Sequence, residues 1–487
     1  MIVQRRIRPE DTSTASGGGK GAGTSAAILG VLVLALMVMQ GLIGWFGLTV
    51  LQIPSIAVML AVLPLMVLLG SRTARSFIAL SAAVFAATLL LVEEPWPVVH
   101  EGITRALHFQ AFVTAVFTLQ EPALRSAMLR DVGLWLLSQP LRRRYTSIML
   151  GTHLLALMMN LGSLVLIGSI AQTREGQGTG DSQEHALDRK QIPLAAIRGF
   201  SPSSMWSPLA LPPAFVASFY PEVPILTVMV WGFGLSILML AFSYLVMLGE
   251  TRATLRRTAM IPASAAPRPP VPVGSLVMLA LTVTLIFGTI ETAARSIGMT
   301  VSTAVIFITP AAALIWLAIQ CRGRPGEIVT GPGRNIVRIR LPQQTSETVV
   351  IVAAAFMGPM LLALLPFDNA IRLFGDAPVA PVFACLVFLG MVGTGLAGFN
   401  PVLTATVAVA VAGDPRSFGL DPLYLILIIL TGWALTAQFS PFTTTSIVAA
   451  RMFDTTPQRL TLVWNGMFFV LSTSLVALVI LGVGFLA

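Results

Sequence analysis

Charged residues are scarce in this chain, and their scarcity argues against a soluble protein. Only 10% of the 487 residues are Asp, Glu, Lys or Arg, whereas 55% are hydrophobic. A soluble domain has about a quarter of its residues charged. Several stretches of about 20 apolar residues are each long enough to cross a bilayer as a helix. The sequence therefore predicts an all-α polytopic membrane protein that lies in a lipid bilayer.

Cysteine is also rare, and the usual catalytic motifs are absent. Cys321 and Cys385 are the two cysteines of the chain, too few for a disulfide framework or a cysteine-based metal site. The sequence has no Gly-rich phosphate loop, no zinc-ligand spacing and no nucleophile elbow. We therefore expect no enzyme activity, no cofactor and no metal centre.

The net charge of +9 is best explained by membrane orientation rather than by nucleic-acid binding. The Lys and Arg residues lie in short loops beside apolar runs, and such residues favour the cytoplasmic side. The apolar run that follows residues 1–25 is too long for the core of a secretory signal. We expect a bacterial inner (cytoplasmic) membrane protein with a cytoplasmic N-terminus and a periplasmic C-terminus.

Hydropathy predicts eleven spans. Residues 1–25 read as a disordered cytoplasmic tail, and residues 125–139 as an amphipathic interfacial helix. The alternating segment 335–341 favours a short surface strand. The predicted spans are 26–48, which is an extra N-terminal helix, then 50–70, 76–92, 104–123, 192–219, 222–249, 273–290, 300–320, 346–366, 422–450 and 460–485.

Two further apolar runs are predicted to enter the membrane and return. If 145–171 crossed once, the basic loop 250–270 would lie outside, against the preference of Lys and Arg for the cytoplasm. A re-entrant hairpin with its tip at Asn160 removes the conflict. The run 380–412 is interrupted around Asn400 and is predicted to be a second hairpin that enters from outside.

Two of the predicted spans carry matched helix breakers. The segment Gly199–Pro208 interrupts 192–219, and the segment Gly432–Pro441 interrupts 422–450. Proline removes a helical hydrogen bond, and the freed backbone groups cannot face lipid. Aligned without a gap, the two regions match at Gly199 and Gly432, Ser207-Pro208 and Ser440-Pro441, Ala217 and Ala450, Pro224 and Pro457, Val230-Trp231 and Val463-Trp464, and Leu238 and Leu471. Such a pair of broken helices indicates a transporter's binding site.

The spans divide into two blocks of opposite orientation. Repeat 1 covers 50–250, a cytoplasmic linker covers 251–272, and repeat 2 covers 273–487. Each block has five spans and one hairpin, and because five is odd the blocks point in opposite directions. This inverted five-helix repeat is a known basis of alternating access.

This order of elements, from about residue 50 to residue 487, resembles the divalent anion/sodium symporter family of the ion transporter superfamily. Asn160 and Asn400 stand where that family has its hairpin-tip asparagines. Ser207-Pro208 and Ser440-Pro441 stand where it has a hydroxyl residue followed by proline. Neither tip reads Ser-Asn-Thr, the family's motif. The resemblance implies an elevator-type transporter, usually a homodimer, for a dicarboxylate coupled to Na⁺.

The polar residues at the tips and breaks are the candidate binding groups for a small-molecule anion and its coupling ion. Half-helices offer N–H groups to anions and carbonyl groups to cations, and hydroxyl and amide oxygens suit both. The alternative is that such residues only kink helices or join neighbours. The candidates are Asn160, Ser163, Ser201, Ser204, Ser207, Pro208, Asn400, Pro401, Thr436, Ser440, Pro441, Thr443, Thr444 and the adjacent Thr445.

Two other side chains near these segments each have two interpretations. His153, inside the first hairpin, is a candidate for proton coupling because histidine titrates near neutrality, or it is a structural histidine. Arg198 opens the first break and either faces a carboxylate or extends to the membrane interface.

We interpret the chain as a secondary active transporter of a small organic anion, a carboxylate or dicarboxylate, coupled to Na⁺ or H⁺. The alternatives are an arsenite-type permease or a cation/proton antiporter of the same superfamily. An antiporter of this kind normally needs intramembrane Asp or Glu, and the acids here lie near span ends. A membrane enzyme and a transport-inactive scaffold are the alternatives of another class.

Overall fold

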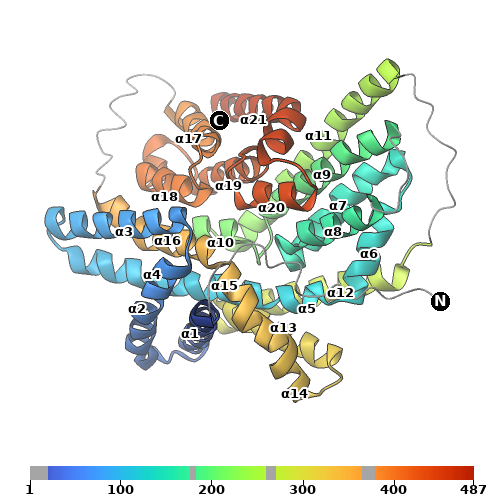
Figure 1. The fold of residues 1–487 in the computed structure, drawn as a ribbon. Helices are drawn as coiled ribbons and strands as arrows, with labels where there is room; N and C mark the ends of the chain where they lie inside the picture. The colour runs from blue at the N-terminus through green and yellow to red at the C-terminus, as the bar shows by residue number, and fades with distance from the viewer. Residues whose placement is uncertain (1–19, 176–182, 259–269, 365–378, 487) are drawn as a thin grey trace.

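The computed structural model describes residues 20–175, 183–258, 270–364 and 379–486 (Figure 1). Within these ranges the regular structure is helical and contains no strand. The first half contains α1 Lys20–Phe46, η2 Thr49–Leu51, α2 Gln52–Leu69, α3 Arg72–Leu91, α4 Pro95–Thr118, α5 Gln120–Leu124, α6 Ala127–Leu137, α7 Leu141–Met159, α8 Gly162–Glu175, α9 Gln183–Ser203, α10 Leu211–Ala217 and α11 Ile225–Thr258. The second half contains α12 Val273–Ile297, α13 Val301–Gln320, α14 Pro325–Ile328, η3 Val329–Gly333, η4 Ile336–Arg340, α15 Leu341–Gln343, α16 Thr345–Leu364, α17 Val379–Leu396, α18 Pro401–Ala412, η7 Pro415–Phe418, α19 Pro422–Phe439, α20 Thr444–Met452, η8 Arg459–Trp464 and α21 Gly466–Leu486.

Eight of the described helical segments are long and apolar enough to cross a membrane. The segments are Gly23–Phe46, Thr49–Leu69, Arg72–Leu91, Ile225–Thr251, Val273–Ile297, Val301–Gln320, Thr345–Leu364 and Pro422–Met452. The coarse prediction of an all-helical polytopic membrane protein is therefore confirmed.

Three segments differ from the sequence prediction. The predicted strand at 335–341 is wrong, because Ile336–Arg340 forms a turn of π-helix, η4. A π-helical turn brings residues five apart onto one face, and here the buried pair is Ile336 and Leu341. Helix α1 begins at Lys20, inside the predicted tail, of which residues 1–19 lie outside the described ranges. Helix α4 begins at Pro95 rather than near residue 104.

Helix α4 is the centre of one helical layer. It packs against α1, α13 and α16, and α16 also packs against α3. A Cβ atom on Gly102 would lie 2.6 Å from the carbonyl oxygen of Phe356, so this glycine allows α4 and α16 to approach closely. Almost every residue from Ala106 to Thr118 is buried. These helices therefore form a closely packed layer beside the hairpin and broken-helix segments.

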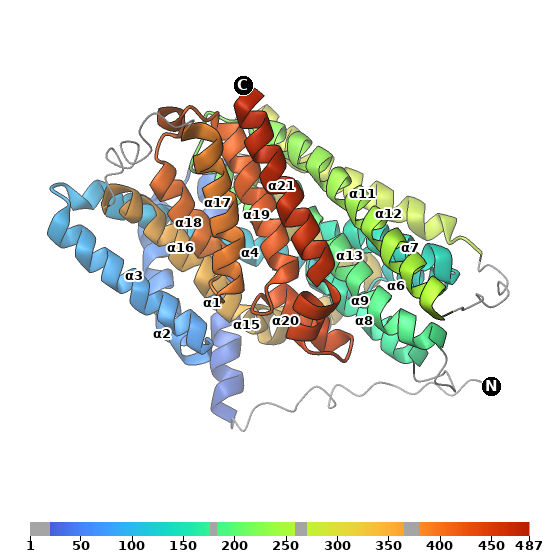
Figure 2. The same ribbon diagram turned by 90° about the horizontal axis from the view of Figure 1, so that it is seen from above.

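The second layer contains the hairpin and broken-helix segments. Figure 1 shows α7, α8 and α9 on the right and α17 to α21 at the centre and upper left, with α10 below α19. The two sets meet where α19 packs against α9 and α10, and where α20 packs against α8 and α9. In Figure 2 the first turn of α1 lies at the bottom and the end of α21 at the top. The start of the first described helix and the end of the last therefore lie at opposite faces of the molecule.

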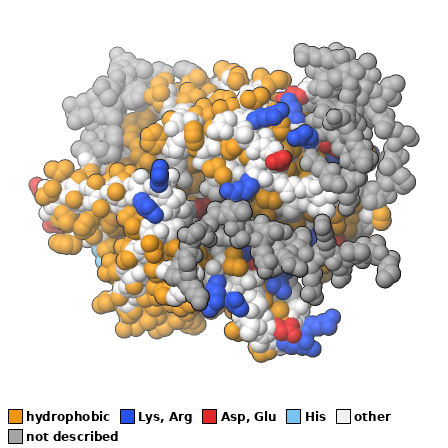
Figure 3. Space-filling model, in the orientation of Figure 1, with side chains coloured by type: hydrophobic (Ala, Val, Ile, Leu, Met, Phe, Trp, Pro, Cys, Tyr) orange, Lys and Arg blue, Asp and Glu red, His pale blue; other side chains and the backbone are white. Residues whose placement is uncertain are grey.

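Large hydrophobic side chains are exposed on several outer helices. Leu90 is 82% exposed on α3, and Leu285 is 70% exposed on α12. Figure 3 shows hydrophobic side chains over the part of this face occupied by α2 and α3, and Lys and Arg side chains toward its middle and right. Exposed apolar patches of this extent mark a surface that contacts lipid or another protein.

Candidate functional site

The first broken helix is interrupted later than its sequence predicts. Gly199–Ser203 remain helical, with Pro202 inside α9, and the interruption covers residues 204–210. The Pro202 carbonyl accepts a hydrogen bond from the Ser236 hydroxyl of α11 at 2.7 Å. The second interruption lies between Phe439 and Thr444. Each break is therefore lined by protein, as buried irregular backbone at membrane depth requires.

The two matched serines make the same local turn. The Ser207 hydroxyl oxygen accepts a hydrogen bond from the Leu209 N–H at 3.3 Å. The Ser440 hydroxyl oxygen accepts one from the Phe442 N–H at 3.2 Å. In each case proline follows the serine and cannot donate, so the hydroxyl pairs with the first N–H beyond it. The hydroxyl proton itself is not used in this turn.

The two matched glycines also have the same role. A Cβ atom on Gly199 would lie 2.1 Å from the carbonyl oxygen of Met149 on α7. A Cβ atom on Gly432 would lie 2.8 Å from Cβ of Met391 on α17. Each glycine therefore lets the first limb of a hairpin segment pack tightly against the broken helix of the same sequence block.

The two ends of the segment α7–α8 lie close together. Arg144, at the start of α7, forms an ion pair with Asp188 in the first part of α9. Asn160, with a φ of 48°, turns the chain between α7 and α8. The next turn of α9 is joined to the end of α11, since Lys190 Nζ lies 3.4 Å from a Glu250 carboxylate oxygen. The segment α7–α8 therefore begins and ends on the same side of the molecule.

The two ends of the segment α17–α18 also lie close together, at another place in the molecule. Near its open end the rings of Phe383 and Phe418 stack with centroids 4.1 Å apart. Arg416 in η7 lies 3.3 Å from a carboxylate oxygen of Glu222, just before α11. Burial raises the pKa of the neighbouring Tyr220 hydroxyl, and the Glu222 and Asp414 carboxylates raise it further.

Helix α11 spans the distance between the open ends of the two hairpin segments, α7–α8 and α17–α18. One lies beside Glu222, which precedes α11, and the other beside Glu250, near the end of α11. At 1.5 Å per helical residue, the separation is about 40 Å. The two hairpin segments therefore open at opposite ends of one long helix.

A cavity of about 100 Å³ lies where the first tip meets both broken helices. Trp433 and Ala437 of α19 are part of its apolar wall. Glu347, in the first turn of α16, is the charged residue of its lining. The polar lining residues come from the α7–α8 turn, the end of α9, the first break, α16 and α20, and they are Asn160, Ser203, Ser204, Ser207, Glu347 and Thr445.

The remaining candidates from the sequence lie outside this lining. Four hydroxyls donate to backbone carbonyl groups: Ser163 to Asn160, Ser201 to Ile197, Thr436 to Met391, and Thr443 to Ala437 and Ser440. Asn400 caps α18 by accepting the Val402 N–H at 2.9 Å. Pro401 and Pro441 are buried, and Thr444 is exposed.

A larger cavity, about 730 Å³, lies on the other side of the first break. Pro208 is part of its wall, together with residues of α10, α11, α12 and α13. Its charged lining residues are Glu291 and Arg295, which are paired at 2.5 Å. His108 also lines it, with Nε2 2.9 Å from the Ser302 hydroxyl. Adjacent residues of the first break, Ser207 and Pro208, therefore line the small and the large cavity respectively.

The geometry of His153 favours a structural role. Its Nδ1 lies 3.0 Å from the Gly199 carbonyl oxygen, and its Nε2 accepts the Trp206 indole N–H at 3.2 Å. Both ring nitrogens are therefore engaged, as in the neutral imidazole with its proton on Nδ1. This contact joins α7 to the end of α9 beside Gly199.

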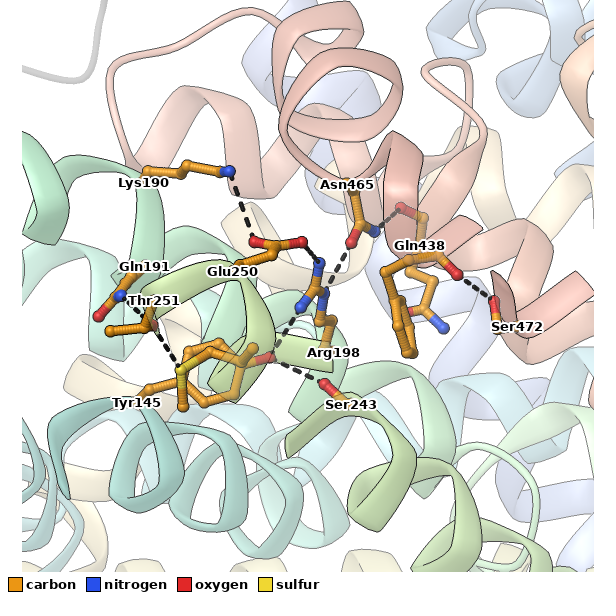
Figure 4. Close-up of polar contacts among 12 residues, drawn as sticks. Tyr145, Lys190, Gln191, Arg198, Ser243, Glu250, Thr251, Gln438, Asn465 and Ser472 are labelled. Atoms are coloured by element: carbon orange, nitrogen blue, oxygen red, sulfur yellow. Dashed lines mark hydrogen bonds and ion pairs between the residues drawn. The ribbon is translucent and has the colours of Figure 1, made fainter. Parts of the chain in front are cut away.

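Arg198 is buried and faces a carboxylate of the protein itself (Figure 4). Its Nε–H donates to Asn465 Oδ1 at 2.7 Å, and its Nη1–H donates to the Tyr145 hydroxyl at 3.1 Å. Its Nη2 lies 3.7 Å from Glu250, and its guanidinium lies over the Phe468 ring. Of the two sequence interpretations, extension to the interface is wrong. The residue joins α7, α9, α11 and the start of α21.

Sequence reasoning missed two polar side chains. Glu347 was placed with the acids near span ends, and no local pattern separates it from them. Gln438 is buried just before the second break, and neither its amide nitrogen nor its amide oxygen has a hydrogen-bond partner among the described residues. The signal available in the sequence is its position two residues before Ser440, in the segment that Pro441 marks as a helix break.

No protein-family model and no curated protein matches this sequence. The chain is similar in structure to the YdaH transporter of Alcanivorax borkumensis, whose crystal structure is described as having an unusual topology. The likeness has a TM-score of 0.56 over 85% of this chain and 99% of that one, with 13% sequence identity. The chain therefore shares its overall fold with that transporter. The likeness concerns the fold, and the narrower symporter resemblance stays a prediction.

Proposed function

We propose that this chain is a secondary active transporter that moves a small organic anion, a carboxylate or dicarboxylate, coupled to Na⁺ or H⁺. The observation that carries the proposal is the meeting of the first tip with both broken helices around one polar cavity. Matched discontinuous helices at such a point are how many secondary transporters bind solute and ion. The transporter fold supports the same conclusion.

The proposed membrane arrangement has eleven spans and two re-entrant hairpins in an inverted repeat. The matched serine turns, the matched glycines and the opposite openings of α7–α8 and α17–α18 support it. In this arrangement α4, α9–α10 and α21 cross in addition to the eight apolar segments. An elevator movement would carry the tips and breaks past the layer around α4.

The chemistry of the breaks suits a carboxylate. The hydroxyl oxygens of Ser207 and Ser440 accept backbone N–H groups, and each hydroxyl proton stays available to an anion. The N-terminus of α8 lies at the first tip, and the positive end of a helix dipole attracts negative charge. Asn160 and Thr445 add further hydrogen-bonding groups to the small cavity.

The two cavity volumes suggest a division of roles. Small-molecule sites usually enclose about 300–1,000 Å³, a range that contains the large cavity and excludes the small one. We assign the large cavity to solute access from the face beside Glu222 and the small one to the coupled site. Opening the break between them would give the solute room near Ser207.

The proposal also covers the cellular location and the oligomeric state of the protein. We place the protein in a bacterial inner membrane, with a cytoplasmic N-terminus and a periplasmic C-terminus, as the loop charges favour. We also propose a homodimer formed through the layer around α4. The exposed apolar side chains of α2, α3 and α12 are available for that contact.

The test combines binding and transport. Purified protein is screened by thermal shift against carboxylates with Na⁺ or with choline, and hits are tested for uptake into proteoliposomes. We expect Ser207→Ala and Ser440→Ala to lose at least about tenfold in transport, because a hydrogen bond to a charged group is worth about 1.5–3 kcal/mol. Ser76→Ala, at an exposed hydroxyl of α3, is the matched control. Wild-type transport by both variants would refute the role of the hydroxyls.

A further inference from the structure

Glu347 has a carboxylate oxygen without a partner at a place where helix movement is proposed. Its Oε2 is enclosed and receives no hydrogen bond from any described residue. The residue belongs to α16, which packs against α3 and α4. The opposite walls of the cavity are the first tip and the first break. Glu347 therefore lies at the boundary between the supporting layer and the hairpin segment.

No described side chain nearby neutralises this carboxylate. The other residues that line the cavity carry no charge. Of the helices packed against α16, α2, α15 and α18 contain no charged residue. Arg72 and Arg75 of α3 are exposed, and Arg75 donates to the carbonyl groups of Val67 and Leu68.

The charged groups of α4 lie further along α16. Gly102 of α4 packs against Phe356, more than two helical turns from Glu347. Glu101 and Arg105 are paired with each other at 2.8 Å. His108, and His100 before it, lie about two helical turns or more from Val116, the α4 residue that lines the cavity. An ionised carboxylate with one oxygen enclosed and without a hydrogen bond or counter-charge is unfavourable, so the group needs a positive charge from elsewhere.

We propose that Glu347 binds the coupling cation of the transport cycle in the small cavity, with oxygen atoms of Asn160, Ser204, Ser207 and Thr445 completing the site. The inference rests on the proposed function and names the residue that holds its ion. The ligand is a positive charge that neutralises the carboxylate, and its source is Na⁺ or a proton.

The size of the cavity supports this assignment. A water molecule takes about 30 Å³ in the liquid, so about 100 Å³ admits a cation with a few waters and is small for an organic solute. The hydroxyl and amide oxygens around Glu347 are ligands that hard cations prefer. His153, the other titratable side chain of this region, has both ring nitrogens engaged.

The site also suggests how ion and solute are coupled. Without its cation, the carboxylate places a negative charge beside Asn160 and Ser207 and repels an anion there. With the cation bound, the cavity is neutral, and the same groups can accept an anionic solute next to it. The ion would thus bind before the solute.

The experiment measures the melting temperature of the purified full-length protein without organic solute. One arm varies Na⁺ at fixed pH, with choline holding the ionic strength constant, and the other varies pH without Na⁺. At an ion concentration about a hundred times Kd, binding should raise the wild-type melting temperature by about 3 °C. A response in the first arm identifies Na⁺, and a response in the second identifies the proton.

Glu347→Gln should abolish the response, because the amide has the same shape and needs no cation. Its melting temperature in choline should stay near that of wild type. Glu327→Gln, at an exposed residue paired with Arg324, is the matched control and should respond fully. If Glu347→Gln does not fold, Glu347→Asp should shift the midpoint of the response to about tenfold higher ion concentration.

The inference is overturned if the wild type responds to neither ion, or if Glu347→Gln, or failing that Glu347→Asp, responds as the wild type does. Its failure is distinguishable from failure of the proposed function. Loss of the ion response in Glu347→Gln, with no carboxylate stabilising or crossing with the wild type, would keep the ion site and reject the anion substrate.

Discussion

Replacing Gly199 with alanine tests the contact that joins the first hairpin segment to the first broken helix. The new Cβ atom would lie 2.1 Å from the Met149 carbonyl oxygen and 2.9 Å from its carbon. These are backbone atoms within a helix, so no side-chain rotation can relieve the overlap. We expect α7 to move away from α9, which would also lengthen the contact between His153 and the Gly199 carbonyl group.

The sign of the effect follows from two opposed contributions. In an open helix, glycine to alanine stabilises by up to about 1 kcal/mol, because alanine has the higher helix propensity. Overpacking against a rigid neighbour costs about 1–3 kcal/mol and sometimes more. At Gly199 the cost of overpacking exceeds the gain in helix propensity. The free energy of unfolding should therefore fall by about 1–2 kcal/mol or more.

The assay is thermal unfolding in detergent, followed by intrinsic fluorescence. At about 2.1 cal/mol/K per residue, the unfolding entropy of 487 residues is about 1 kcal/mol/K. Gly199→Ala should therefore lower the melting temperature by about 1–2 °C or more. Gly234→Ala is the matched control, since Gly234 lies in α11 with nothing within 4 Å of its Cβ position. It should be neutral or slightly stabilising. A Gly199→Ala protein as stable as the Gly234→Ala protein would refute the close contact.

Two further predictions concern sidedness and asymmetry. A cysteine in place of exposed Gln172 on α8 should be labelled from the cytoplasm, and one in place of exposed Ser417 in η7 from the other face; labelling of both from one face would contradict the opposed hairpins. Cysteines at Asn160 and Asn400 should change in accessibility in opposite directions when a transported solute is added. Parallel changes at the two positions would argue against an inverted repeat.

The breaks could be predicted from sequence because their cause is local. Ser207 and Ser440 each precede a proline, and the same residue pair produces the same turn in both places. The boundary of the first break was less predictable. Pro202 stays inside α9, which ends one residue later, and its carbonyl group accepts a hydrogen bond from Ser236 of α11. A tertiary partner of that kind leaves no mark in the local sequence.

Long-range contacts explain the remaining differences. The alternation at 335–341 has the period of a strand, yet Asn335 and Arg340 are held by Glu121 from a distant segment, with Arg340 Nε 2.8 Å from its carboxylate. Glu347 lies by sequence at the edge of a span, and its position in the cavity depends on how α16 packs against α4. Residue spacing alone indicates neither contact.

The two predicted tips, one in each sequence block, occupy different surroundings in this structure. Asn160 lines the small cavity, whereas Asn400 caps α18 and is not among the residues of that lining. A transporter built from two inverted halves needs this difference, because two halves in identical surroundings would leave both faces equally open or equally closed. Exchange of the two conformations between the halves opens the other face. In the proposed transport cycle this structure would be one end state, and in the other end state the polar cavity would form around Asn400, Thr436 and Ser440.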